Sequence, residues 1–183
     1  MLFGIFILTP FTFDKCALTF FILFIIPKIF LDRTSHKNYY CIMCGIFGYR
    51  GDRDAVNIVF EGLKTLEYRG YDSWGITWMQ DNKLSTLKEI GKLPASIPQQ
   101  KKSSLAIGHT RWATHGGITH QNAHPHPDCT GKIAVIHNGI IENYSNLKAN
   151  LILKGHVFLS ETDTEVFPHL IEELVKKMPF ELA

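Results

Sequence analysis

The sequence predicts a layered α+β or mixed α/β domain from residue 43 onward. Short apolar strands follow one another directly at some points and are separated by helical segments at others, which is typical of layered packing and not of a βαβ series. The chain has no internal repeat and no GxGxxG segment, so nothing indicates a dinucleotide site. Apolar residues make up 45% and charged residues 20% of the 183 residues, which excludes a disordered or low-complexity chain.

The first half of this domain reads as a strand, a helix and a hairpin. Residues 45–49 form a short apolar strand, and Asp54 is expected to cap the helix that follows. The apolar positions of this helix recur at helical spacing: Val56, Val59, Phe60, Leu63 and Leu66. Residues 74–80 and 84–90 are predicted to be two strands that turn at Asp81-Asn82.

The second half alternates strands, a long loop and two helices. Strands are expected at 105–108 and 133–136, with a polar, His- and Gly-rich loop over 110–131 between them. A helix over 144–153 should end at Gly155. A second amphipathic helix is expected over 162–177, with an apolar face formed by Val166, Leu170, Leu174 and Val175.

Residues 1–42 differ from residues 43–183. They carry a net charge of +2, whereas residues 43–183 hold 15 basic and 15 acidic residues, so no basic face indicates nucleic-acid binding. The apolar stretch 17–26 is shorter than the ~20 residues that a membrane-spanning helix needs. We interpret residues 1–42 as upstream sequence read from a start before Met43. A membrane anchor or targeting segment and a cleaved pro-segment are the alternatives.

The cysteines favour a reduced compartment. The chain has four, and the Cys41 and Cys44 pair has no second pair that would complete a zinc ribbon. A cytoplasmic location is therefore expected. Cys44 directly follows Met43, so removal of the methionine would make it N-terminal, with an α-amine that can take the thiol proton. The alternative is a buried core cysteine at the start of a strand.

A second cluster surrounds Arg111 in the segment GHTRWATHG. Its guanidinium suits a substrate carboxylate, and Thr114 and His115 add hydrogen-bonding groups nearby. The crowded histidines of this region also permit a metal site or caps for loop carbonyls, although their spacing matches no known zinc pattern. These histidines are His109, His115, His120, His124 and His126.

A third cluster combines HNGIIENY with SETDTE. Asn138 and Gly139 after a strand form a turn, or they present a side-chain amide and a backbone N–H to an oxyanion. Asp163 in the first turn of a helix either complements the helix dipole or binds a substrate ammonium.

In their order along the chain, six segments resemble the class II glutamine amidotransferases. They are MCGIFGY, LEYRGYDSWGI, GHTRWATHG, NAHPH, HNGIIENY and SETDTEV, spread over residues 43 to about 170. Within that class they resemble the N-terminal glutaminase domain of the glucosamine-6-phosphate synthases, also called glutamine–fructose-6-phosphate aminotransferases. Other class II glutamine amidotransferases are the alternative, but they do not usually carry EYRGYDS, TRWATHG and SETDTE together.

The resemblance implies the fold of an N-terminal-nucleophile hydrolase, an αββα four-layer sandwich, here incomplete at the C-terminus of residues 43–183. It implies that Cys44 is the nucleophile, that its α-amine is the base, and that Asn138 and Gly139 hold the oxyanion. It also implies a set of residues that bind glutamine: Arg111, Trp112, Thr114, His115 and Asp163.

For the whole enzyme, the resemblance implies that ammonia from glutamine converts fructose 6-phosphate to glucosamine 6-phosphate. That step requires an isomerase domain outside this sequence and neither a metal nor an organic cofactor. A homo-oligomer is expected only for the full-length enzyme. Two alternatives from other classes are a catalytically silent remnant with a membrane-anchoring N-terminus and a metal-binding histidine protein.

Overall fold

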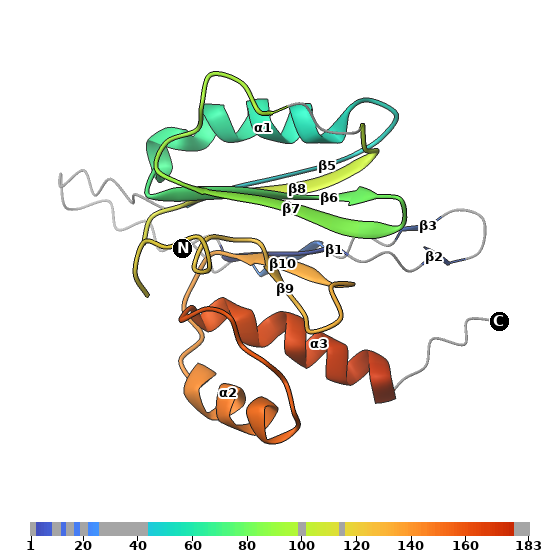
Figure 1. Ribbon diagram of the computed structural model, residues 1–183, viewed down its shortest axis with the longest axis vertical. Helices are drawn as coiled ribbons and strands as arrows, with labels where there is room; N and C mark the ends of the chain where they lie inside the picture. The colour runs from blue at the N-terminus through green and yellow to red at the C-terminus, as the bar shows by residue number, and fades with distance from the viewer. Residues whose placement is uncertain are drawn as a thin grey trace, which may run out of the picture.

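The computed structural model describes residues 3–8, 12–13, 17–18, 22–25, 44–98, 102–113 and 116–177. Two sheets lie between helices (Figure 1): α1 (Ala55–Leu66) covers the first sheet, and α2 (Tyr144–Leu153) and α3 (Val166–Lys177) lie beyond the second. Among the described residues, no helix has the length and hydropathy that crossing a membrane requires.

The first sheet is antiparallel, with strand order β5-β8-β6-β7. Its strands are β5 (Gly45–Arg50), β6 (Ser73–Gln80), β7 (Lys83–Ile90) and β8 (Leu105–Arg111). The predicted hairpin is confirmed, since Asp81 and Asn82 join β6 to β7 with φ of 50° and 60°. Positive φ at both central residues is typical of a type I′ turn, whose twist matches that of the flanking strands.

The second sheet has strand order β4-β1-β10-β9. Strand β1 pairs antiparallel with both β4 and β10, and Ile5 lies opposite His137. The bounds are β1 (Phe3–Leu8), β4 (Ile22–Ile25), β9 (His126–Pro127) and β10 (Ala134–His137). A separate two-stranded pair consists of β2 (Thr12–Phe13) and β3 (Ala17–Leu18). The interpretation of residues 1–42 as upstream sequence stays a prediction.

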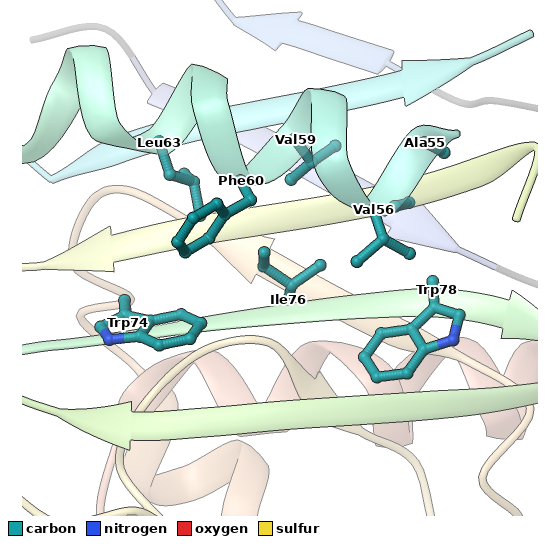
Figure 2. Close-up of a cluster of buried hydrophobic side chains, with 9 residues drawn as sticks. Ala55, Val56, Val59, Phe60, Leu63, Trp74, Ile76 and Trp78 are labelled. Carbon is teal, nitrogen blue, oxygen red and sulfur yellow. The ribbon is translucent and has the colours of Figure 1, made fainter. Parts of the chain in front are cut away.

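Helix α1 packs on the first sheet through its predicted apolar stripe. The predicted cap is confirmed, because the Asp54 carboxylate accepts a hydrogen bond from the Val56 N–H over 3.2 Å. Figure 2 shows the helix side chains directed at β6, where the Phe60 and Trp74 rings meet edge to face with centroids 5.9 Å apart. The buried residues of this core are Ala55, Val56, Val59, Phe60, Leu63, Trp74, Ile76, Trp78 and Ala106.

Strand β8 links the two layers because its side chains alternate between them. Leu105 and Ile107 pack with Ala134 and Ile136 of β10, whereas Ala106 packs in the core under α1. By the same period of two, His109 and Arg111 belong to the face directed at the second sheet.

The predicted loop over 110–131 is wrong at its start, since Thr110 and Arg111 are the last residues of β8. Thr110 pairs with Gly45 and Arg111 with Ser73, and these partners extend the strand beyond its apolar part.

The two helices beyond the second sheet follow the prediction closely. Helix α2 has the predicted bounds, and Gly155 follows it with φ +90°. The predicted helix over 162–177 instead begins with a 3₁₀ turn, η2 (Asp163–Glu165), before α3. Leu174 was assigned to its apolar face but is 58% exposed. The buried side of α3 holds Val166, Pro168, His169 and Glu172, so polar side chains occupy part of it.

Candidate active site

Cys44 lies at the start of β5, partly buried against the end of β8. The Trp112 backbone N–H donates a hydrogen bond to its Sγ over 3.1 Å. Burial raises the pKa of the Cys44 thiol, whereas the N–H groups of Trp112 and of Cys44 itself, together with the charge of Arg111, oppose that rise. The charge of Asp72 adds to the rise, so the two N–H groups and Arg111 offset the effect of burial only in part.

Two hydrogen bonds in series connect the buried His109 to the backbone of Cys44. His109 Nε2 lies 2.8 Å from Asn138 Oδ1, and Asn138 Nδ2 donates to the Cys44 carbonyl over 2.8 Å. Because a carbonyl oxygen only accepts, His109 must carry its proton on Nε2. Burial is the main cause that lowers the pKa of His109 to about 4, so its ring is neutral near pH 7. His109 thereby fixes which end of the Asn138 amide faces Cys44.

Arg111 is a buried cation between acidic groups. One guanidinium nitrogen donates to the Gly117 carbonyl over 3.1 Å. Burial lowers the pKa of Arg111, while the charges of Cys44, Asp72 and Asp163 raise it. Asp163, the first residue of η2, accepts a hydrogen bond from the Ile141 N–H over 2.7 Å. The segment after Asn138 is thereby tied to a carboxylate that lies within electrostatic reach of Arg111.

Asp72 is a residue of this region to which the sequence analysis gave no role. Its carboxylate accepts from the Ala113 N–H over 2.9 Å, and its own N–H donates to the Arg111 carbonyl over 3.1 Å. The approach is close, because a Cβ on Gly70 would lie 2.8 Å from the Arg111 carbonyl carbon. The segment LEYRGYDSWGI thus holds the chain in place where it leaves β8. Its presence among the family segments was the one signal that could have found Asp72.

The loop before η2 is fixed by its own carboxylates. Glu161 accepts from the Asn122 side-chain amide over 3.1 Å, and Thr162 lies 2.9 Å from Nε2 of His126. Glu165 accepts from the Ser160 N–H over 2.7 Å. Burial raises the pKa of Glu165, but its interaction with His169 and the hydrogen bonds it accepts from Leu159 and Ser160 outweigh burial and lower the pKa to about 2. The segments NAHPH and SETDTE are therefore held together.

The clustered histidines bond to side chains more than to loop carbonyls. The rings of His109, His124 and His126 follow one another at centroid distances of 4.3 and 4.5 Å. Among the residues that the structure describes, neither ring nitrogen of His124 has a hydrogen-bond partner. His120 contacts a backbone carbonyl, that of Lys88, over 3.1 Å, and His115 lies outside the described residues. Within the described part of the chain, the side chains that could share a metal ion do not belong to this histidine cluster. They are Cys129, His156, His169 and Glu172.

The structure brings together most of the residues predicted from the sequence. Cys44, Arg111, Asn138 and Asp163 converge as described above. The Trp112 backbone contacts Cys44, and its ring packs edge to face on Tyr71 at 5.5 Å. Gly139 is exposed with φ +146°, a conformation that favours glycine. Thr114 and His115 lie outside the described residues, so their roles stay predictions.

Comparisons with known proteins assign the class. Residues 94–182 match the family profile described as a glutamine amidotransferase domain. A glutamine phosphoribosylpyrophosphate amidotransferase from B. subtilis has 33% identity and a TM-score of 0.57, covering 69% of this chain and 29% of its own. A second structure, an allosteric regulatory enzyme of purine biosynthesis, has 34% identity and a TM-score of 0.59 over the same shares. The chain therefore contains a glutamine amidotransferase domain, and its sheets and helices fit the N-terminal-nucleophile hydrolase fold of these structural neighbours.

Within that family, the chain is homologous to the isomerizing glutamine–fructose-6-phosphate aminotransferases. It is 55% identical over 135 residues to that of Pyrococcus horikoshii, covering 72% of this chain and 23% of the relative. The identity to that of Methanococcus maripaludis is also 55%, over 141 residues, 73% of this chain and 23% of the relative. The chain therefore spans about 23% of the length of these relatives.

Proposed function

We propose that this domain hydrolyses the side-chain amide of glutamine, with Cys44 as the nucleophile. The observation that carries the proposal is the convergence on Cys44 of the Trp112 N–H at its sulfur and the Asn138 amide at its carbonyl. The N–H of Cys44 itself also acts to lower the pKa of its thiol. Once Met43 is removed, that nitrogen becomes an α-amine with a pKa near 7.7–8.0, able to take the thiol proton.

The reaction then proceeds in two steps on the sulfur. The thiolate attacks the amide carbon of glutamine, and the oxyanion that forms is stabilised by Asn138 Nδ2 and the Gly139 N–H. The α-amine gives its proton to the leaving nitrogen, and ammonia departs from a γ-glutamyl thioester. Water attacks the thioester, glutamate leaves, and the thiol is restored. The bond from His109 supports this role of Asn138, because it keeps Nδ2 directed at Cys44.

Glutamine is oriented by its α-carboxylate and α-ammonium groups. In this proposal, the buried Arg111 binds the carboxylate through its guanidinium fork, with Trp112, Thr114 and His115 beside it. Asp163, which is 6% exposed, binds the ammonium. The electrostatic influence of Asp163 on Arg111 supports this assignment, since a cation and a carboxylate in one site can bind the two opposite charges of an amino acid.

We also propose that the ammonia serves the reaction for which the relatives are named, the conversion of fructose 6-phosphate to glucosamine 6-phosphate in the cytoplasm. The domain would comprise residues 43–183 as part of an αββα sandwich, and residues 1–42 would be upstream sequence. The full-length enzyme would carry the isomerase step without a metal or organic cofactor and would assemble as a homo-oligomer.

A diazoketone analogue of glutamine tests the nucleophile. A form begun at Met43, with the methionine removed, should be alkylated at Cys44, and excess glutamine should slow the labelling. The exposed Cys129 provides the internal control. A form that retains residues 1–42 should not be labelled, because the Cys44 nitrogen is then an amide. Labelling at Cys129, or equal labelling of both forms at Cys44 with Met1 still present, would contradict the proposal.

A further inference from the structure

Four potential metal ligands converge from three segments away from Cys44. Cys129 lies between β9 and β10, and His156 lies three residues after the end of α2. His169 and Glu172 lie one turn apart on α3. Figure 1 shows α2 and α3 next to each other beyond the second sheet. His156, His169 and Glu172 are buried, whereas Cys129 is exposed. None of the four has a part in the proposed glutamine hydrolysis.

The distances that involve the two Nδ1 atoms match the edges of a tetrahedron around one ion, and all four ligand atoms lie within 4.8 Å of one another. Cys129 Sγ lies 3.5 Å from His169 Nδ1 and 3.7 Å from His156 Nδ1. The two Nδ1 atoms are 3.2 Å apart, and Glu172 Oε2 lies 3.2 Å from that of His156 and 3.7 Å from that of His169. Zinc–sulfur bonds of about 2.3 Å and zinc–nitrogen or zinc–oxygen bonds of about 2.0–2.2 Å give tetrahedral edges of about 3.3–3.6 Å.

When the His156 ring is neutral, hydrogen bonding alone does not account for this geometry. Nε2 of His156 lies 3.0 Å from the Glu173 carboxylate, which only accepts. In the neutral ring the proton is therefore on Nε2, and Nδ1 presents a lone pair. That lone pair faces a sulfur, a carboxylate oxygen and the Nδ1 of His169. Such a collection of electron-pair donors is stabilised by a cation at its centre, and a carboxylate on the far nitrogen is the usual partner of a metal-bound histidine.

The neighbours of Cys129, Glu172 and His169 are also compatible with a metal ion at the centre of the cluster. The Val157 N–H donates to Cys129 Sγ over 3.4 Å, which supports a thiolate. Lys176 pairs with Glu172 Oε1 over 2.7 Å. Oε2 accepts a hydrogen bond from the Cys129 N–H over 3.2 Å, and its second lone pair can form a single metal bond. Glu165 lies 3.8 Å from His169 Nε2, on the side of the ring opposite the cluster.

We propose that Cys129, His156, His169 and Glu172 bind one zinc ion in a tetrahedral site. A thiolate, two imidazoles and a carboxylate suit this borderline-soft ion, and binding releases the Cys129 thiol proton. Because the protein supplies all four ligands, no coordination position is left for a substrate, and the role is structural. The ion would join the β9–β10 turn and the end of α2 to α3, independently of whether the domain hydrolyses glutamine.

Metal analysis of the untagged full chain tests this site. After reconstitution with zinc and gel filtration against a weak chelator, the chain should retain about one zinc per molecule. Cys129→Ser and His156→Asn should each lower the retained zinc at least about tenfold. Cys44→Ser and His120→Asn are the matched controls and should retain it. A wild-type chain without zinc, or a Cys129→Ser chain with the wild-type content, would overturn the site.

A measurement on the wild-type chain covers the case in which the variants do not fold. Bound zinc should slow alkylation of Cys129 by iodoacetamide and leave the rate at Cys44 unchanged, with each site followed by mass spectrometry. Cobalt(II) in place of zinc should give a thiolate charge-transfer band and the intense visible bands of tetrahedral coordination. Equal alkylation of Cys129 with and without zinc, or an octahedral cobalt spectrum, would refute the assignment.

Discussion

Mild acid should destabilise this domain through three buried histidines, and His109 sets the magnitude. His109, His124 and His126 are at most 6% exposed, and burial is the main cause that lowers the pKa of each. The pKa of His109 is about 4 in the folded chain, against ~6.5 for an exposed histidine. Between these values the unfolded chain binds a proton that the folded chain does not. The stabilisation is thus complete above about pH 6.5 and is lost as the pH falls toward about 4.

The expected loss is large enough to measure by urea denaturation. From about pH 7.5 to about pH 5, His109 alone should lower the free energy of unfolding by about 2 kcal/mol. His124 and His126 act in the same direction. The fluorescence of the buried Trp74 and Trp78 reports the transition. Stopping at about pH 5 limits the contribution of the carboxylates, because exposed Asp and Glu titrate near ~4.

Two variants separate these histidines from other titrating groups. His120→Asn removes an exposed ring and should show the full wild-type loss between the two pH values. His124→Leu removes a buried ring that has no hydrogen-bond partner in the described part of the chain, so the stability of this variant should depend less on pH. A wild-type loss below about 0.5 kcal/mol, or the same pH dependence in His124→Leu as in the wild type, would refute the reasoning.

Three substitutions test the site and the core. Asn138→Ala removes an oxyanion donor and should lower kcat for glutamate release about 10²–10³-fold; a loss below about threefold would leave Asn138 with a turn role only. Asp163→Asn removes the proposed partner of the substrate ammonium and should raise the KM for glutamine more than it lowers kcat, and an unchanged KM would contradict that role. Phe60→Ala should lower the free energy of unfolding by about 3–5 kcal/mol, because Phe60 is 1% exposed and packs on Trp74. Urea denaturation measures this, and a loss under about 1 kcal/mol would mean that neighbours refill the cavity.

Features set by neighbouring residues could be predicted from the sequence. The Asp54 cap, the turn at Asp81-Asn82 and the bounds of α2 follow from local chemistry and agree with the structure. The full length of β8 could not be predicted in this way. Thr110 and Arg111 remain in the strand because they pair with Gly45 and Ser73, which are distant in the sequence.

The same distinction applies to α3 and to the site. Apolar periodicity selected Leu174, yet the buried side of α3 holds His169 and Glu172, whose partners Cys129 and His156 come from other segments. The resemblance placed Cys44, Asn138 and Arg111 in one region. It gave no role to Asp72 or His109. Asp72 bonds to the backbone of Ala113 and His109 to the amide of Asn138, so both position other groups of the protein, which only the structure shows.

The position of Cys44 limits when its amine can be exposed. In the folded domain its sulfur is bonded by Trp112 and its carbonyl by Asn138, so the residue is held between β8 and the end of β10. An aminopeptidase must take the first residues of a chain into its own cleft, which this arrangement prevents. If Cys44 is the nucleophile, the methionine must therefore leave while the nascent chain is still emerging from the ribosome. The fraction of active molecules would then depend on the rate of methionine removal relative to the rate of folding. A molecule that folded before its methionine was removed would stay inactive.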